Sequence, residues 1–433
     1  MALITKKKIV ILGGGFGGIK AAFFLCKKIK KLGLEEKYEV ILIDKNSFHT
    51  YTPILYEIAA TSEEIADQSQ LKEIATFDLK SVFSGYRITV LQDLVKELDL
   101  AGGDIHLEKN GVFKFDYLML AIGSEINYFG IAGLKENSLS LKSFHDALEI
   151  RNAVWDKVKN NNSKKEIKIV IGGGGSTGVE VAGEMRSWIC EPGEKSPECP
   201  ASVTIVEAYP SLLFGFDQKI IKAVTRRLKA IGVKLLLNEA IEKAEPGKII
   251  LKSGRLLDYD ILIWTGGVKT ASLMGTLPLK KETKGRVEVA GEMECLPQSP
   301  DLKLYGKIYG LGDAICLYNP KTGRPMPMVA EAAIEQAGVA AFNIIEDIKF
   351  NEGLSKKIRN KKYVPREYSY VITAGGKYAA VKIGPLVFWG FSGWILKVMV
   401  ELYYLIRRLL PPGKAIRVWL KGLRIFMRND GLG

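Results

Sequence analysis

The chain has 433 residues, a formal net charge of +14 at pH 7 and an apolar fraction of 47%. This length and apolar content suit two or three globular domains with sizeable cores and exclude a disordered protein. The five cysteines are odd in number and show no CxxC or Cys/His metal spacing, so we expect no bound metal and a reducing, cytosolic compartment.

The first segment of interest, KKIVILGGGFGGIKAAFFL, is a β-branched run followed by a glycine cluster and a helix-compatible stretch. No apolar signal segment precedes it, so we expect no export. Gly13, Gly15 and Gly18 form a GxGxxG pattern, which provides a tight turn, close approach to a pyrophosphate and close helix packing. The next apolar run ends at Asp44, whose carboxylate can bind the hydroxyls of an adenosine ribose. This combination predicts a dinucleotide site.

The same plan returns roughly 160 residues later in IKIVIGGGGSTGVEVAGEM, which indicates an internal duplication. Gly173, Gly175 and Gly178 repeat the glycine pattern, and the run ASVTIVE ends at Glu207. An acid at the ribose would repel a 2′-phosphate, so the second site should favour NADH over NADPH. A loop that keeps the fold but no longer binds nucleotide is the alternative.

Two dinucleotide sites in one chain predict a tightly held redox cofactor and a diffusing one, because a hydride needs a donor and an acceptor in contact. We expect FAD in the first domain and NADH in the second. The predicted fold is α/β, with two Rossmann-like domains and a C-terminal amphipathic membrane-binding region. The FAD domain is discontinuous over 1–118 and 266–350, the NADH domain covers 119–265, and the membrane-attachment region covers 351–433.

The stretch CEPGEKSPECP, bracketed by Cys190 and Cys199, is rich in proline, glycine and charge and predicts a surface loop. Two free thiols are the favoured interpretation, with a disulfide as the alternative.

The tail after Ile383 is dense in aromatic, apolar and basic residues, and PPG separates two helical patterns. No uncharged stretch reaches the ~20 residues of a spanning helix. A basic stripe and an apolar face predict a helix lying in the plane of a membrane, at the cytoplasmic side, rather than a nucleic-acid contact. A homodimer through the apolar face is the alternative. The stripe comprises Arg417, Lys421, Arg424 and Arg428, and the apolar face comprises Ile416, Trp419, Leu420, Leu423 and Met427.

Four further segments carry a family resemblance: NSFHTYTPILYEIA from Asn46, AIGSEINYFGIAGLKENSLSLKS from Ala121, IWTGGV from Ile263 and YGLGDA from Tyr309. With the glycine loops, they make the chain resemble the two-dinucleotide-binding flavoproteins and, among them, the type II NADH:quinone oxidoreductases. The resemblance covers essentially the whole length. It implies oxidation of NADH through bound FAD, reduction of a membrane quinone and no ion pumping.

The resemblance also suggests site residues. It implies that Asp313 binds the flavin ribityl chain, and that Glu184 and Lys377 act near the flavin ring, although a helix cap, a first-turn acid and a solvated lysine are the respective alternatives. His49 is expected to be structural. The candidate FAD residues are Gly13, Gly15, Phe16, Gly17, Gly18, Asp44, Lys45, Ala121, Gly123, Asp313 and Ala314; the candidate NADH residues are Gly173, Gly175, Thr177, Gly178, Glu180, Glu207 and Gly266.

The chain departs from the family at AEAAIEQ from Ala330, where AQxAxQQ is usual near the quinone head group. Glu331, Glu335 and Gln336 are therefore the candidate quinone residues. A glutamic acid with a raised pKa could donate a proton to quinone, whereas a glutamine could only form a hydrogen bond. A solvated or salt-bridged helix acid is the alternative.

Three rival functions share this fold. A sulfide:quinone reductase would need cysteines near the flavin, such as Cys316 with Cys190 or Cys295. An apoptosis-inducing-factor-like protein would bind NADH with slow turnover, and a soluble NADH:acceptor reductase would not need the tail.

Overall fold

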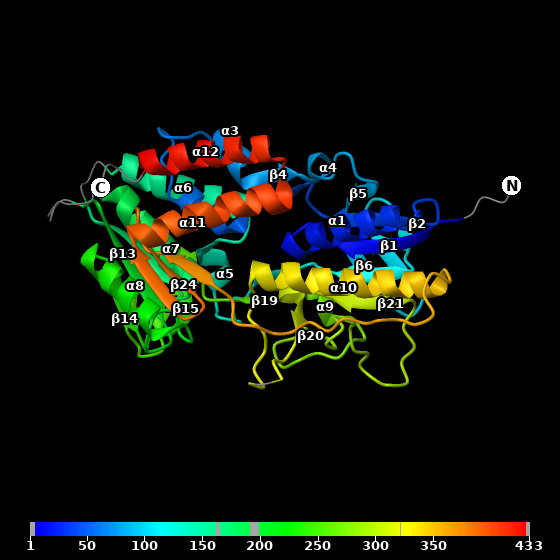
Figure 1. Cartoon of the computed structure of the whole chain (residues 1–433). Helices are drawn as coiled ribbons and strands as arrows, with labels where there is room; N and C mark the ends of the chain where they lie inside the picture. Colours follow the sequence, from blue (N-terminus) through cyan, green and yellow to red (C-terminus); the bar gives the residue numbers. More distant parts are fainter. Residues whose placement is uncertain (1–4, 162–164, 191–198, 321, 430–433) are drawn as a thin grey trace. The chain divides into compact units, whose positions relative to one another are not determined.

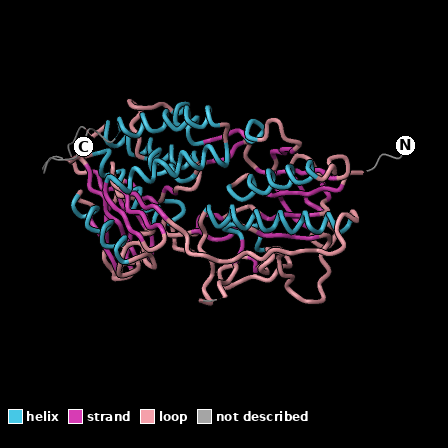
Figure 2. The backbone as a smooth tube through the Cα atoms, viewed as in Figure 1, coloured by secondary structure: helices cyan, strands magenta, loops and turns pink. Residues whose placement is uncertain are grey.

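The structure is a computed structural model that describes residues 5–161, 165–190, 199–320 and 322–429. The chain combines helices with strands, and the strands often follow one another directly (Figure 2). The chain divides into two compact units, each assembled from three segments. Unit 1 comprises Met1–His49, Phe77–Glu125 and Val268–Tyr368, and unit 2 comprises Thr50–Thr76, Ile126–Gly267 and Ser369–Gly433.

Unit 1 is built on a five-stranded sheet in the order β21-β9-β1-β2-β5, with parallel neighbours throughout. The central strand β1 buries Ile9 to Leu12 completely, as a β-branched run between two covered faces requires. Helices α1 and α10 pack side by side on this sheet (Figure 1). The strands of this sheet and the two helices are β1 (Lys7–Leu12), α1 (Phe16–Lys31), β2 (Tyr38–Asp44), β5 (Ile88–Gln92), β9 (Tyr117–Leu120), β21 (Lys307–Gly310) and α10 (Ala330–Asn351).

An antiparallel three-stranded sheet lies between β5 and β9 in the chain and completes the crossover between them. Its strands are β6 (Val95–Asp99), β7 (Asp104–Leu107) and β8 (Val112–Lys114). The smaller elements of unit 1 are α4 (Leu79–Val82), β19 (Val268–Thr270), α9 (Ser272–Gly275), β20 (Val287–Glu288), η2 (Gly312–Ala314) and β22 (Ile315–Cys316). The short strands β3 (Phe48–Thr50), β4 (Thr76–Asp78) and β10 (Ser124–Ile126) fall where the chain passes from one unit to the other.

Unit 2 repeats this plan with the order β11-β18-β12-β13-β14, again parallel, and with an antiparallel insertion, β15-β16-β17, before the closing strand. The predicted duplication is therefore present in the strand order as well as in the glycine loops. Its elements are α5 (Leu134–Asn137), β11 (Leu139–Ser140), α6 (Phe144–Lys159), β12 (Ile167–Gly172), α7 (Ser176–Ile189), β13 (Ala201–Glu207), α8 (Gln218–Ala230), β14 (Lys234–Leu237), β15 (Ile241–Glu245), β16 (Lys248–Leu251), β17 (Leu256–Asp258) and β18 (Ile261–Trp264).

Unit 2 also contains the C-terminal elements, which pack on a short helical segment from near the N-terminus. Helix α12 lies against α3, and α11 lies against an antiparallel sheet β23-β24-β25. Pro411 and Pro412 separate the two helices, and Pro412 stands at the first position of α12, where its missing N–H has no helical partner to lose. These elements are η1 (Thr52–Ile54), α2 (Leu55–Ala59), α3 (Gln68–Ala75), β23 (Tyr370–Thr373), β24 (Ala379–Ile383), β25 (Leu386–Gly390), α11 (Phe391–Tyr404), the π-helical turn η3 (Leu405–Leu409) and α12 (Pro412–Asn429).

The two units differ from the expected ranges in four places. Residues 119–125, expected in the NADH domain, belong to unit 1, and residues 266–267, expected in the FAD domain, belong to unit 2. Residues 50–76, expected in the FAD domain, belong to unit 2, and the expected tail 351–433 is divided after Tyr368. Within the described ranges, no helix has the length and apolarity needed to cross a membrane.

Candidate functional site

The first glycine loop connects β1 to α1 and leaves room for a phosphate. Gly13 has a φ of +109°, and a Cβ there would lie 2.3 Å from the carbonyl oxygen of Ala121 at the end of β9. A Cβ at Gly18 would lie 1.9 Å from the oxygen of Gly13, so α1 packs closely on the loop. Gly15, in contrast, faces open space at the N-terminus of α1, where free amides favour an anion. The loop fits a pyrophosphate.

The carboxylate of Asp44 is held against this loop by backbone amides. Gly14 N donates to Oδ2 at 2.6 Å, and Asn46 N donates to Oδ1 at 2.7 Å. Burial raises the pKa of Asp44. His49 is buried, lies 3.0 Å from the oxygen of Gly14 and meets the ring of Phe16 edge-on. Burial lowers the pKa of His49 to about 4, so the ring is neutral and supports the loop.

The 3₁₀ turn η2 carries Asp313 and is held by two hydrogen bonds, one of them to Gln336. Ser124 Oγ donates to Asp313 Oδ2 at 2.8 Å, and the Gly312 amide donates to Gln336 Oε1 at 2.8 Å. Because Gln336 is only 2% exposed, it positions the Asp313 turn from the side of α10. Gln336 therefore contacts the turn that carries Asp313, and its predicted contact with quinone stays a prediction.

The second glycine loop, between β12 and α7, repeats the geometry of the first. Gly173 has a φ of +107°, and its Cβ would lie 2.6 Å from Cα of Gly266 after β18. A Cβ at Gly178 would lie 1.9 Å from the oxygen of Gly173. Gly175 again faces open space, beside Thr177 in the first turn of α7. Unit 2 therefore offers a second pyrophosphate site.

Glu207 occupies the position that Asp44 has in unit 1. The Gly174 amide donates to Oε2 at 2.5 Å, and the Tyr209 amide donates to Oε1 at 2.8 Å. Each carboxylate thus binds the middle of its glycine loop and the residue two places further on. The remaining lone pairs can accept from the hydroxyls of a ribose.

Helix α7 carries Glu180 and Glu184 on successive turns and packs against the hairpin turn that bears Lys377. The Thr373 amide donates to Glu180 Oε1 at 3.4 Å. A Cβ at Gly183 would lie 2.5 Å from the Gly375 nitrogen, so the turn sits directly on the helix.

Arg227 of α8 anchors the same turn from its other side, by donating to the carbonyl oxygens of Ala374 at 3.4 Å and Gly375 at 3.2 Å. No motif in the sequence indicated this residue. Together, α7 and α8 bring the two glutamates and the turn of Lys377 into one region of unit 2.

Burial raises the pKa of Glu180 to about 8, despite the amide of Thr373 and the charge of Lys397. Between the ordinary pKa of 4.5 and about 8, the folded protein holds a proton that the unfolded chain has released. The free energy of unfolding should therefore fall as pH rises through this window, by up to about 1.4 kcal/mol per pH unit. Glu180→Gln should flatten this dependence in urea denaturation from pH 5 to pH 8; an unchanged slope would contradict the shift.

Glu331 and Glu335 near the start of α10 are both paired with Arg366. The distance from Arg366 Nη2 to Glu331 Oε1 is 3.3 Å, and Glu335 forms a closer contact. Tyr368 Oη donates to Glu335 Oε2 at 2.7 Å and also contacts the hydroxyl of Tyr363. This arrangement corresponds to the salt-bridged alternative, and a contact of these glutamates with quinone stays a prediction.

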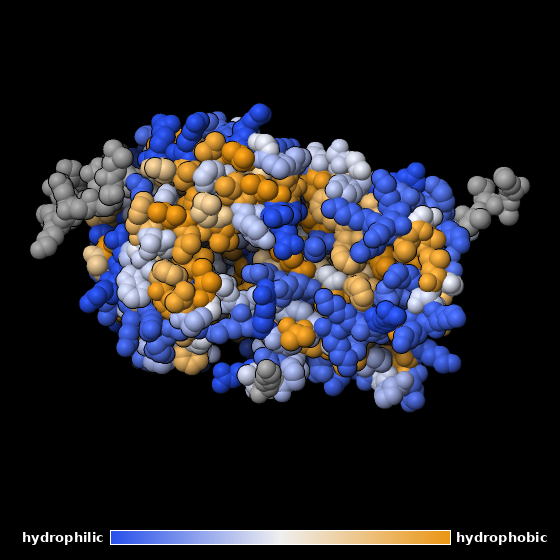
Figure 3. Space-filling view, in the orientation of Figure 1, coloured by the Kyte–Doolittle hydropathy of each residue, from blue (hydrophilic) through white to orange (hydrophobic). Residues whose placement is uncertain are grey.

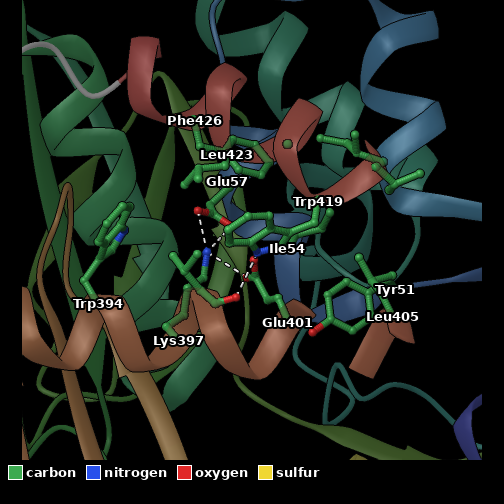
Figure 4. Close-up of a pocket in the computed structure, with 14 residues that line it drawn as sticks. Tyr51, Ile54, Glu57, Trp394, Lys397, Glu401, Leu405, Trp419, Leu423 and Phe426 are labelled. Carbon is green, nitrogen blue, oxygen red and sulfur yellow. Dashed lines mark hydrogen bonds and ion pairs between the residues drawn. The ribbon is translucent and has the colours of Figure 1, made fainter. Parts of the chain in front are cut away.

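A cavity in unit 2 lies between the C-terminal helices and the segment from Tyr51 to Ile74 (Figure 4). Lys397 Nζ lies 2.7 Å from each carboxylate oxygen of Glu57 and 2.8 Å from Glu401 Oε1. Burial alone would lower the pKa of Lys397, but Glu401 and Glu57 hold it above its ordinary value. This cluster was not predicted from the sequence, although Lys397 and Glu401 interrupt an apolar stretch.

Of the four cysteines considered for a surface disulfide or for a sulfide enzyme, two are bonded to each other and two are buried. Cys190 and Cys199 form a disulfide with a Cα–Cα distance of 5.3 Å, which differs from the favoured free thiols; the loop between them lies outside the described residues. Cys295 and Cys316 are buried, and burial raises the pKa of both thiols. Cys190 is therefore not available as a partner for Cys316.

Two parallel-sheet units, each with a glycine loop and a matching acid, define the class of two-dinucleotide oxidoreductases. The family described as pyridine nucleotide-disulphide oxidoreductase matches residues 7–337, and the chain belongs to this family.

Individual relatives are more specific. Proteins named type II NADH:quinone oxidoreductase from Haemophilus influenzae and Staphylococcus aureus are 29% and 26% identical to the chain, over 78% of its length and 80% and 82% of theirs. They confirm the resemblance identified in the sequence.

Solved structures agree on the fold. NDH2 of Plasmodium falciparum in complex with NADH has a TM-score of 0.78 at 18% identity and covers 97% of this chain and 98% of that one. The sulfide:quinone oxidoreductase of Aquifex aeolicus has a TM-score of 0.72 at 20% identity, covering 94% and 92%.

Proposed function

We propose that the protein oxidises NADH and reduces a membrane quinone through bound FAD, without pumping ions. The main support is the pair of equivalent dinucleotide sites in one chain, together with the NADH:quinone activity named for its relatives. A sulfide enzyme of the same fold is less well supported, because the second glycine loop and Glu207 repeat the geometry of the first loop and Asp44, and a sulfide enzyme would not need this second site.

FAD, when bound, accepts a hydride from NADH and delivers two electrons to quinone. In this assignment, the amides at the start of α1 bind the FAD pyrophosphate, and those at the start of α7 bind that of NADH. Glu207 binds the adenosine ribose and repels a 2′-phosphate. By the family resemblance, Lys377 would supply a positive charge to the flavin ring, and Glu184, which is buried on α7, would border the nicotinamide.

We further propose that unit 2 attaches to the cytoplasmic face of the cell membrane. Apolar residues gather over α11 and α12 in the space-filling view (Figure 3). On α11 they recur every four residues and are exposed, as one face of a helix in a bilayer surface would be. These residues are Phe391, Ile395, Met399 and Tyr403, beside Trp389 of β25.

Helix α12 adds cations to this face in a pattern that differs from the expected one. Arg417, Arg424 and Arg428 are exposed, but Lys421 is paired with Glu73. Trp419, expected on the apolar face, is partly buried and donates from Nε1 to the Val398 oxygen at 2.9 Å. Three arginines, rather than four cations, remain to contact anionic lipid.

Replacing Arg417, Arg424 and Arg428 with glutamine should weaken binding to anionic vesicles roughly 100-fold, since each cation contributes about 1 kcal/mol. Binding to neutral vesicles should change little. A variant with serine in place of Phe391, Ile395, Met399 and Tyr403 should bind both anionic and neutral vesicles more weakly, as measured by vesicle co-sedimentation. Serine at Val112 and Leu256, two exposed apolar residues outside this face, is the control. A serine variant that stays on vesicles but changes from dimer to monomer in ultracentrifugation would favour the homodimer.

The test of the activity is anaerobic stopped-flow on the purified FAD-bound protein, with flavin absorbance followed after addition of NADH, NADPH or sulfide, and then of a water-soluble quinone. Rapid bleaching by NADH alone and rapid reoxidation by quinone are expected. Bleaching by sulfide but not by NADH would replace the proposal with a sulfide:quinone reductase, and slow turnover with quinone would favour a binding or signalling role.

A further inference from the structure

Two aromatic side chains stand exposed on the surface of unit 2 and stack on each other. The ring centroids of Tyr209 and Phe214 are 4.3 Å apart, with an angle of 8° between the ring planes. Tyr209 is 53% exposed and Phe214 is 58% exposed. Each ring therefore covers one face of the other and leaves much of its surface to water. A flat apolar surface of this kind suits a flat aromatic ligand.

Hydrogen bonds from two backbone amides tie the segment of this pair to Glu207 and to the second glycine loop. The Tyr209 amide donates to Glu207, and the Leu213 amide donates to the Gly174 oxygen at 2.8 Å. Leu213 has a φ of +50°, an unfavourable value for leucine, and its side chain is buried. The buried leucine holds this conformation, which directs the chain outward at Phe214.

The first glycine loop carries no such pair among the described residues. Asp44 is followed by a segment that turns inward, where His49 is buried against the Gly14 oxygen and Phe16. The two loops are otherwise alike in their glycines and in their amide-bound acids. The aromatic pair thus distinguishes the site of the diffusing dinucleotide from that of the retained one.

We propose that Tyr209 and Phe214 form the platform on which the adenine of NADH stacks when NADH binds at the second loop. This inference rests on the proposed function, which assigns NADH to that loop. Glu207 binds the adenosine ribose, and the purine is joined to the same ribose, so it comes to lie beside the residues that directly follow Glu207. Stacking on an aromatic side chain tolerates changes in the base because every base has a π-face.

The platform predicts that the adenosine half of NADH, and not its nicotinamide half, depends on these rings. Tyr209→Ala and Phe214→Ala in the FAD-bound protein should each weaken ADP-ribose binding about 5- to 50-fold in titration calorimetry. The KM for NADH should rise by a similar factor, and the KM for reduced nicotinamide mononucleotide should rise far less. The dinucleotide with hypoxanthine in place of adenine should bind the wild type about as well as NADH.

Two variants serve as controls. Tyr209→Phe keeps the ring and should keep the affinity for ADP-ribose, whereas Leu256→Ala removes an equally exposed side chain of unit 2 and should change nothing. Unchanged ADP-ribose affinity in both alanine variants, with NADH still oxidised by the wild type, would overturn the platform and leave the proposed function intact. A wild type that neither binds ADP-ribose nor oxidises NADH would overturn both.

Discussion

Gly13→Ala is expected to yield a protein without flavin, whereas Gly173→Ala should retain flavin and lose its response to NADH. At both positions φ is near +110°, and a Cβ would press within 2.3 Å and 2.6 Å of backbone atoms on the neighbouring strand end. The left-handed region costs roughly 1–2 kcal/mol for a residue with a side chain, and the contact adds about 1–3 kcal/mol of strain in the phosphate loop. Flavin absorbance of the purified variants and bleaching by NADH report the two losses separately.

Gly111→Ala and Gly254→Ala are the matched controls, because each has a positive φ but meets no atom within 4 Å of the added Cβ. They should keep both flavin and NADH oxidation. If Gly173→Ala lost its flavin as well, the assignment of the two dinucleotides to separate loops would have to be abandoned.

Lys397→Met should lower the free energy of unfolding by about 3–5 kcal/mol, because it leaves the carboxylates of Glu57 and Glu401 buried without their cation. Lys421→Met removes the exposed pair with Glu73 and should cost at most about 1 kcal/mol. Urea denaturation of the two variants at one pH gives this comparison directly.

A second variant separates charge from packing. Adding Glu57→Gln and Glu401→Gln to Lys397→Met removes the unpaired charges and should restore part of the lost stability. Equal destabilisation by Lys397→Met and Lys421→Met, or no recovery in the triple variant, would show that the buried charges do not matter.

The two dinucleotide domains could be predicted from the sequence because their signals are local. A glycine that needs positive φ, a β-branched run before it and an acid at the end of the next strand all follow from the conformation of one βαβ unit. Gly13, Gly173, Asp44 and Glu207 are accordingly found where such a unit requires them.

The buried ion cluster could not be predicted in this way, because Glu57 and Lys397 are 340 residues apart. The same reason applies to Arg366, which pairs with Glu331 and Glu335. These residues lie far apart in the chain, and no repeating pattern in the sequence links them. The sequence shows that these charges stand in apolar or helical surroundings, but not which partner neutralises them.

Helix α12 illustrates a third limit. The periodicity of its sequence separates basic from apolar positions. It does not predict which side of the helix packs on the rest of the protein. The structure uses Gly422, Ile425 and Phe426 for packing. As a result, Ile416 and Leu420 share the exposed side with the arginines.

The proposed attachment of the exposed apolar side of α11 to a membrane would affect how the amount of quinone should be expressed. An enzyme resting on a bilayer meets its hydrophobic substrate by lateral diffusion, so the relevant measure is the mole fraction of quinone in the lipid rather than its molarity in the sample. Adding quinone-free lipid in the same bilayers would then dilute quinone in two dimensions and slow turnover, while the supply of NADH from the aqueous phase stayed constant.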